Sequence, residues 1–145
     1  MKKIIHILNR KGTNILTISP DTTVNEALQI MDDKNVGSLV VTENEEYLGI
    51  VTERDYARKV VLKGKDSAHT PVSEIMTTDF PKLSEDDSVD RCMHLMNQNN
   101  LRYLPVMKEK KIVGLISIMD VIKETVLSQQ ETISELHQYI SGSSY

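Results

Sequence analysis

Apolar side chains along this chain follow two alternating patterns. Within 24–31 and 89–96 they recur every three or four residues, which predicts helices with one buried face. The runs SLVV and YLGIV, and later YLPVM and IVGLIS, are short and continuous, and polar turns (ENEE, KEKK) separate their members. Each pair of runs therefore predicts a β-hairpin, and a second helix is expected after each hairpin.

The pattern occurs twice at a fixed offset. Residues 15–61 overlay residues 80–126 without a gap when the sequence is shifted by 65 positions. The heptad GIVTERD at 49–55 returns as GLISIMD at 114–120, with a glycine, two apolar residues, a hydroxyl side chain and an aspartate at the same places. A fixed offset of this kind predicts two copies of one structural unit.

Each copy predicts the order strand, helix, strand, strand, helix. A unit of about 50 residues is near the lower limit for burying a sufficient core alone. We therefore expect an α+β fold in which the two copies pack pseudo-symmetrically through their sheets and leave clefts along the seam. The expected divisions are an N-terminal lead-in with a short helix (1–14), copy one (15–62), a linker with a short helix (63–79), copy two (80–126) and a C-terminal helical tail (127–145).

Composition restricts the classes of protein that the chain fits. Its 145 residues carry a formal net charge of −4, which argues against a nucleic-acid-binding protein because such proteins carry a basic surface. The apolar run at 4–8 is interrupted by His6 and is too short for a signal peptide or a membrane span. We expect a cytoplasmic protein that does not enter a membrane. The single cysteine, Cys92, excludes an internal disulfide and replaces Ala27 in the repeat, so we expect it in the core.

The repeated motifs resemble a known family. VSEIMT before copy two, NVGSLVV and NLRYLPV in mid-copy, and the two heptads are similar to the cystathionine-β-synthase (CBS) domain, in the tandem pair called a Bateman module. TERDYARKVVLKGK and ELHQYISGSSY further resemble the small stand-alone CBS-pair proteins. The resemblance covers nearly the whole chain. It implies two β-α-β-β-α repeats, adenosine nucleotides in the clefts between them, and a homodimer.

The hydroxyl and the carboxylate of each heptad suit a sugar phosphate. Thr52 or Ser117 would stand at a helix N-terminus, where free backbone N–H groups favour an anion. Asp55 or Asp120, one turn on, is placed to accept hydrogen bonds from two neighbouring ribose hydroxyls. The same spacing is also a helix capping box, in which the two side chains bond each other's backbone N–H groups. Two such heptads at equivalent places of a repeat favour the ligand site.

The residues before the second strand differ between the copies. Gly37 and Ser38 are small and are expected to leave room for a ligand, whereas Arg102 offers a planar guanidinium suited to phosphate. In the family the leading strands line the adenine, although they also fit a plain core. The nucleotide-binding residues predicted from the motifs and the resemblance are Ile18, Gly37, Ser38, Thr52, Arg54, Asp55, Leu83, Arg102, Tyr103, Pro105, Ser117, Met119 and Asp120.

The charges around the two heptads predict unequal clefts. Arg54, Arg58 and Lys59 make the first cleft basic, unless they form only a solvated helix face, whereas the second is expected to be apolar around Ile118 and Met119.

These features favour a regulatory module. We expect it to bind AMP first, with ADP, ATP or NAD as further candidates, and to modulate a partner protein that the sequence does not identify. The sequence contains no P-loop, G-x-G-x-x-G, G-x-S-x-G or H-E-x-x-H motif, so we expect no catalytic residues, no metal site and no catalytic cofactor. The alternative is a ligand-free CBS-pair dimer that acts as an interaction or structural protein. An apolar stripe in the tail either covers the module or packs against a second chain: Val126, Ile133, Leu136 and Ile140.

Overall fold

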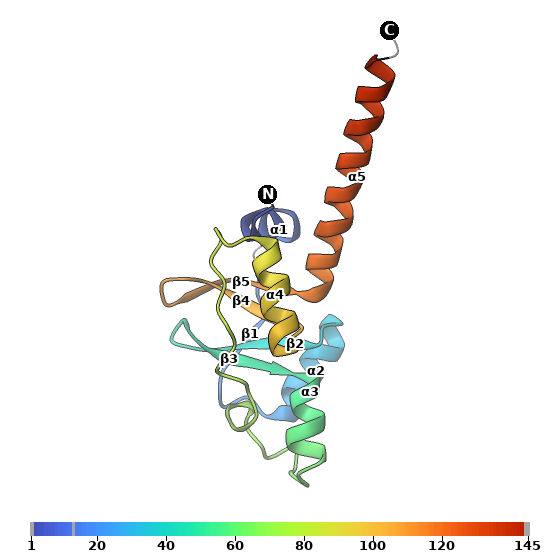
Figure 1. Ribbon diagram of the computed structural model, residues 1–145. Helices are drawn as coiled ribbons and strands as arrows, with labels where there is room; N and C mark the ends of the chain where they lie inside the picture. The colour runs from blue at the N-terminus through green and yellow to red at the C-terminus, as the bar shows by residue number, and fades with distance from the viewer. Residues whose placement is uncertain (1, 13, 144–145) are drawn as a thin grey trace.

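The computed structural model describes residues 2–12 and 14–143, with side chains as far as residue 141, and contains both copies of the repeat. Copy one contains β1 (Thr17–Ile18), α2 (Val24–Lys34), β2 (Ser38–Glu43), β3 (Glu46–Thr52) and α3 (Glu53–Tyr56), which continues as a π-helical turn over Ala57–Val61. Copy two contains α4 (Val89–Asn99), β4 (Tyr103–Lys108), β5 (Lys111–Ser117) and α5 (Ile118–Ser143). Short helices precede the copies: α1 (Ile4–Lys11) and a 3-10 helix over Val72–Glu74. Copy two lies above copy one in Figure 1.

The strand register confirms the internal repeat. β1 runs parallel to β2 with Ile18 opposite Val41. In copy two Leu83 lies opposite Val106 in the same sense, which is the same pair shifted by 65 positions. Both hairpins are irregular at the same place, directly after Val41 and directly after Val106. The leading strand expected in copy two, however, is reduced to the single bridge at Leu83, so the described part of that sheet has two strands, β4 and β5.

A proline explains the shorter leading strand of copy two. In copy one the Val40 N–H donates a hydrogen bond to the Leu16 carbonyl over 3.1 Å. The residue equivalent to Val40 is Pro105, which has no N–H to donate, so the corresponding bond cannot form. The bonds that remain are those of Leu83, which donates to the Pro105 carbonyl and accepts from the Met107 N–H.

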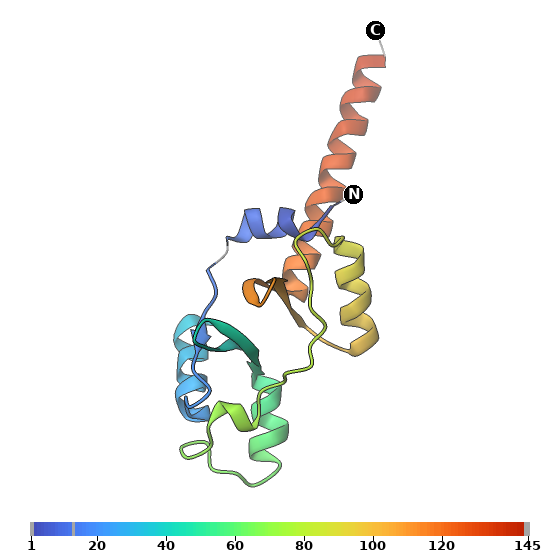
Figure 2. The same cartoon turned by 90° about the vertical axis from the view of Figure 1, so that its left-hand side faces the viewer.

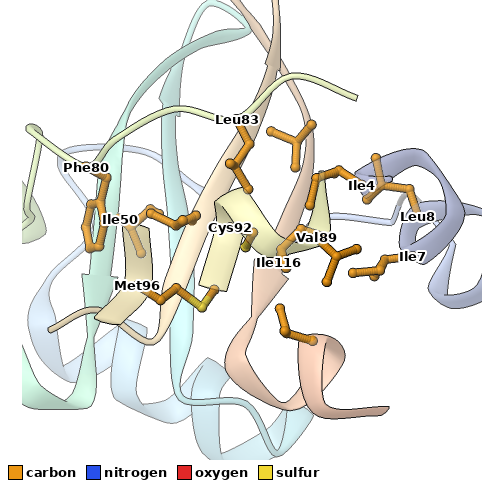
Figure 3. Packing of buried hydrophobic residues seen from close by; sticks show 13 residues of the cluster. Ile4, Ile7, Leu8, Ile50, Phe80, Leu83, Val89, Cys92, Met96 and Ile116 are labelled. Carbon is orange, nitrogen blue, oxygen red and sulfur yellow. The ribbon is translucent and has the colours of Figure 1, made fainter. Parts of the chain in front are cut away.

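The core of each copy is completed by the short helix that precedes the other copy. Ile4, Ile7 and Leu8 of α1 pack into copy two, and Figure 3 shows them near Val89 and Ile116. The 3-10 helix before copy two packs the other way, because its Val72 and the following Ile75 belong to the core of copy one. The two lead-in segments thus cross between the copies and tie them together.

The two sheets meet along β3 and β5, which confirms that the copies pack through their sheets. Ile50 of β3 is buried in the core of copy two. Beside it, the Ile50 and Thr77 backbones exchange two hydrogen bonds of 2.9 and 3.0 Å as the linker crosses β3. A Cβ on Gly49 would lie 2.7 Å from the Thr77 carbonyl oxygen, and a Cβ on Gly114 would overlap the Leu8 side chain. The glycine that opens each heptad therefore lies against a lead-in segment, which presents its backbone to Gly49 and the buried Leu8 side chain to Gly114.

Cys92 is fully buried in α4, as expected. Burial raises the pKa of its thiol to about 12, so the thiol stays protonated and unreactive at neutral pH. Among the described residues, no helix combines the length and the apolar character needed to cross a bilayer.

Candidate functional site

A cleft of about 1360 Å³ lies between the two copies. Copy one forms one wall with the end of β3, α3 and the π-helical turn, and copy two forms the other with α4, the start of β4 and the start of α5. Figure 1 places α3 directly below α4, and Figure 2 places it below α4 and to one side. Six of the predicted site residues line this cleft: Gly37, Thr52, Arg54, Asp55, Arg102 and Tyr103.

The first heptad ends in a complete capping box. Asp55 Oδ2 accepts the Thr52 N–H over 2.9 Å, and Thr52 Oγ1 accepts the Asp55 N–H over 3.1 Å. The cap alternative is therefore realised in the geometry of this heptad. The same bonds hold the Asp55 carboxylate, which is only 7% exposed, in the wall of the cleft.

The second oxygen of Asp55 is held by two further partners. Lys59 Nζ lies 3.0 Å from Asp55 Oδ1, one helical turn along the same element. The Thr77 hydroxyl donates to the same oxygen over 3.3 Å from the linker. Sequence analysis missed Thr77, because the linker was treated as a connection between the copies rather than as part of the cleft wall.

The cleft carries an excess of positive charge in an acidic protein. Four lysine and arginine side chains line it against the two carboxylates of Glu53 and Asp55: Arg54, Arg58, Lys59 and Arg102. The expected basic character of the first cleft is thereby confirmed. Arg54 also spans the seam, since its Nη1 donates to the Asn100 carbonyl of copy two over 3.3 Å. Arg102 comes from the opposite wall, so cations of both copies converge on one space.

The space beside Gly37 is filled by a side chain of the other copy. A Cβ on Gly37 would lie 2.8 Å from the Tyr103 hydroxyl oxygen. Ser38 lies in β2 and is only 6% exposed. Gly37 nevertheless lines the cleft, so the expectation that this small pair leaves room for a ligand stays a prediction.

Apolar side chains form the rest of the cleft wall. Met93 and Met96 of α4, Phe80 at the start of copy two, and Ile118 and Ile122 of α5 complete the lining. Ile118 of the second heptad was expected in the second cleft, but the start of α5 places it in the first cleft. Met119 lies on the surface and is 54% exposed, and it does not line this cleft. Ile118 thus belongs to the first cleft, and an apolar second cleft around Met119 stays a prediction.

The second heptad forms the same box with a different cation. The Ser117 N–H donates to Asp120 Oδ2 over 2.8 Å, and the Asp120 N–H donates to Ser117 Oγ over 3.2 Å. Lys11 of α1 donates to Asp120 Oδ2 over 2.7 Å and to the Leu115 carbonyl over 2.8 Å. Burial alone would raise the pKa of the Asp120 carboxyl, but the bonds from Lys11 and Ser117 outweigh burial and hold this pKa below its usual value.

Three predicted residues lie in strands or in the core rather than in the cleft. Ile18, Leu83 and Pro105 are buried, and Leu83 is 2% exposed within the core of copy two. Their predicted contact with adenine stays a prediction. The residue that sequence analysis missed near Asp120 is Lys11. The only signal for it was the pair of basic residues, Arg10 and Lys11, in the last turn of α1.

Comparison with known proteins places both copies in one family. The family model "CBS domain" matches residues 5–62 and 72–127. The chain is 39% identical over 148 residues to the mitochondrial CBS domain-containing protein CBSX3 of Arabidopsis thaliana, covering 96% of this chain and 72% of that protein. It is 34% identical to the CBS domain-containing protein YhcV of Bacillus subtilis, covering 74% of this chain and 76% of the relative.

Solved structures agree with the fold. A protein with CBS domains from Burkholderia ambifaria matches with a TM-score of 0.83 and 40% identity, over 88% of this chain and 96% of that chain. A hexameric CBS-CP12 protein from bloom-forming cyanobacteria matches with a TM-score of 0.72 and 30% identity, over 84% of this chain and 70% of that chain.

Proposed function

The chain belongs to the CBS-domain family, and on that premise we propose that it is a regulatory module that binds an adenine nucleotide between its two copies. AMP is the first candidate, and ADP, ATP and NAD share the adenosine monophosphate portion that the cleft would recognise. The proposal includes no catalytic step, no metal and no catalytic cofactor. Among the described residues, no three metal-ligating side chains are grouped together.

The observation that carries the proposal is the distribution of charge in the cleft. The chain has a net charge of −4, yet its inter-copy cleft is lined by four cationic side chains and two carboxylates. A positively charged cleft in an acidic protein favours a small anion. The negatively charged surface elsewhere repels anions, whereas the cleft attracts them. Guanidinium groups such as that of Arg102 bind phosphate oxygens through two parallel hydrogen bonds.

The remaining groups suit the rest of a nucleotide. Asp55 is a buried carboxylate whose oxygens are held in fixed positions by Thr52, Lys59 and Thr77, so it can exchange its lysine contact for ribose hydroxyls without a change of rotamer. The apolar side chains of α4 and α5 offer a surface for the base. Phosphate would then lie toward the arginines, and its occupancy would draw the walls of the two copies together.

The regulatory part of the proposal follows from this geometry. A ligand changes a conformational equilibrium only through its different affinity for the two states. A nucleotide that contacts Asp55 in copy one and Arg102 in copy two would favour the closed arrangement of the copies. We place the protein in the cytoplasm as a homodimer, where a partner protein would sense this arrangement.

A second function has a specific observation in its favour. Both heptads form complete capping boxes, and both carboxylates already have a lysine partner, Lys59 or Lys11. These bonds satisfy Asp55 and Asp120 without any ligand. A ligand-free CBS-pair dimer that serves as an interaction or structural protein is therefore the alternative.

A thermal-shift screen separates the two functions. A ligand that binds only the folded state, at a hundredfold excess over its Kd, stabilises that state by about 2.7 kcal/mol, which raises Tm by ~5–10 °C for a chain of this size. We expect such a shift with AMP and none with inorganic phosphate at the same concentration. No shift with AMP, ADP, ATP or NAD would reject the nucleotide module in favour of the ligand-free dimer.

A further inference from the structure

Helix α5 continues well beyond the body of the protein. It spans 26 residues, and Figures 1 and 2 show its C-terminal half projecting away from both copies. Every side chain described from Glu131 to Ser141 is exposed. An isolated helix shorter than about 12–15 residues is marginal in water, and most helices in proteins are stabilised by a buried apolar face. The projecting half therefore lacks, within the described chain, the packing that normally stabilises a helix.

Most of the exposed apolar residues of α5 follow a heptad repeat, and Ile118, Leu127 and Tyr139 are exposed outside it. The positions of this repeat are spaced alternately by three and four residues and are apolar except at Gln129. We name the whole set the α5 stripe: Met119, Ile122, Val126, Gln129, Ile133, Leu136 and Ile140. Five of its apolar members are between 45% and 59% exposed, and Ile140 is 64% exposed. With Met119 as position a, the set fills every a and d position of three heptads.

The opposite side of α5 is the one that packs on the body. Val121 and Glu124, at positions c and f, are each 2% exposed. Glu124 faces Arg10 at 3.4 Å, and Glu131, again at f, lies 3.2 Å from the same arginine of α1. The helix is thus fixed to its own module through its c and f positions. Of its a and d positions, Ile122 lines the inter-copy cleft, whereas those from Val126 onward lie outside that cleft.

From this arrangement we propose that the part of the α5 stripe from Val126 onward pairs with the same residues of a second copy as a parallel two-stranded coiled coil. β-Branched residues at a with leucine at d favour two parallel strands, and Val126, Ile133 and Leu136 follow this rule. In a parallel pair Gln129 lies opposite its counterpart. The two side-chain amides can then hydrogen-bond to each other instead of being buried against apolar side chains. This inference does not depend on nucleotide binding.

The flanking positions favour a second copy over a different protein. Positions e and g from Thr125 onward carry no acidic or lysine and arginine side chain: Thr125, Gln130, Thr132, His137 and Tyr139. Two identical helices therefore meet without like-charge repulsion, and the flanks lack the complementary charges that select a different helix. The acidic residues of this segment, Glu131 and Glu135, lie at f and c, away from the seam.

The test is sedimentation of the full chain with matched variants. We expect the wild type at twice the monomer mass of 16.4 kDa. Ile133→Asp places a carboxylate in the seam and should weaken the dimer about a hundredfold or more. Gln138→Asp adds the same charge at an f position and should leave the dimer intact. Both side chains are exposed, so neither change should alter the fold of the module, which circular dichroism verifies.

Cross-linking tests the orientation. Cys92 is buried and does not compete, so Leu136→Cys and Gln138→Cys each add one accessible thiol. In a parallel pair position 136 faces its counterpart within disulfide range, so Leu136→Cys should form a covalent dimer with oxidised glutathione much faster than Gln138→Cys. A monomeric wild type, a dimer unaffected by Ile133→Asp, or equal cross-linking at both positions would each overturn the proposal.

Discussion

Asp55 and Asp120 occupy the same position in the two copies and are paired with cations from different elements. Asp55 meets Lys59, which lies one turn further along its own helix. The residue equivalent to Lys59 in copy two is Glu124, which cannot pair with Asp120, and the cation there comes from Lys11 of α1. The repeat therefore fixes the position of each carboxylate, whereas the element that supplies its cation differs between the two copies.

Arg102 separates phosphate recognition from recognition of the nucleoside. If its guanidinium binds the phosphate, Arg102→Gln removes a charge-assisted hydrogen bond of about 1.5–3 kcal/mol, or ~10–100-fold in Kd for AMP. Binding of adenosine, which has no phosphate, should stay the same. Titration calorimetry with both ligands measures this, and Lys110→Gln in the turn before β5 is the matched control. An equal loss of affinity for AMP and for adenosine would show that Arg102 does not bind the phosphate.

Asp120 should make stability depend on pH. Its pKa in the folded protein is held below the ordinary value of 3.8. Its contribution is thus fully present above that unfolded-state pKa and is lost as the pH falls through the folded-state pKa. At pH 7, Asp120→Asn should lower the free energy of unfolding by about 1 kcal/mol, because the Lys11 contact loses its charge.

Urea unfolding at two pH values checks this effect of Asp120→Asn. The difference between wild type and variant should shrink from pH 7 to pH 3, as the wild-type carboxyl begins to take up protons. A difference that grows as the pH falls would contradict the assigned role of Lys11.

At the scale of elements, the heptads combine a cap, a close packing contact and a strand-to-helix turn. The hairpins, both main helices and their offset of 65 positions follow from the sequence pattern, because apolar periodicity is local. The shortened leading strand of copy two was not expected, although Pro105 carries the reason. The exchange of lead-in helices was also not expected, since nothing in the spacing of Ile4, Ile7 and Leu8 shows which copy buries them.

The glycines of copy one test how closely its elements pack. Gly49→Ala brings a Cβ against the Thr77 carbonyl, a backbone atom that cannot move alone, so we expect a loss of about 1–3 kcal/mol in unfolding free energy. Gly37→Ala meets only the end of the Tyr103 side chain, which can turn away, so its loss should be smaller. Urea unfolding measures both. A larger loss for Gly37→Ala would contradict the crossing of the linker over Gly49.

At the scale of the whole molecule, the lead-in segments, the sheet seam and the cleft form one connected unit. The linker that crosses β3 brings the Thr77 hydroxyl into a hydrogen bond with Asp55. The helix that packs on copy two, α1, likewise brings the Lys11 ammonium into a hydrogen bond with Asp120. Six of the thirteen predicted site residues share the first cleft, because they lie where the repeats face each other. Thr77 and Lys11 could not be predicted from the motifs, because tertiary crossing brings them there.

The central claim is that this cleft binds a nucleotide through Asp55. Titration calorimetry with AMP on wild type, Asp55→Asn and the surface control Asp33→Asn tests it most directly. The side-chain amide introduced by Asp55→Asn keeps an oxygen for the Thr52 N–H and so preserves the cap, but it lacks the charge and one acceptor for ribose hydroxyls. We predict saturable binding by wild type and Asp33→Asn, and an affinity at least about tenfold lower for Asp55→Asn. No heat of binding for wild type, or equal Kd values for all three proteins, would contradict the claim.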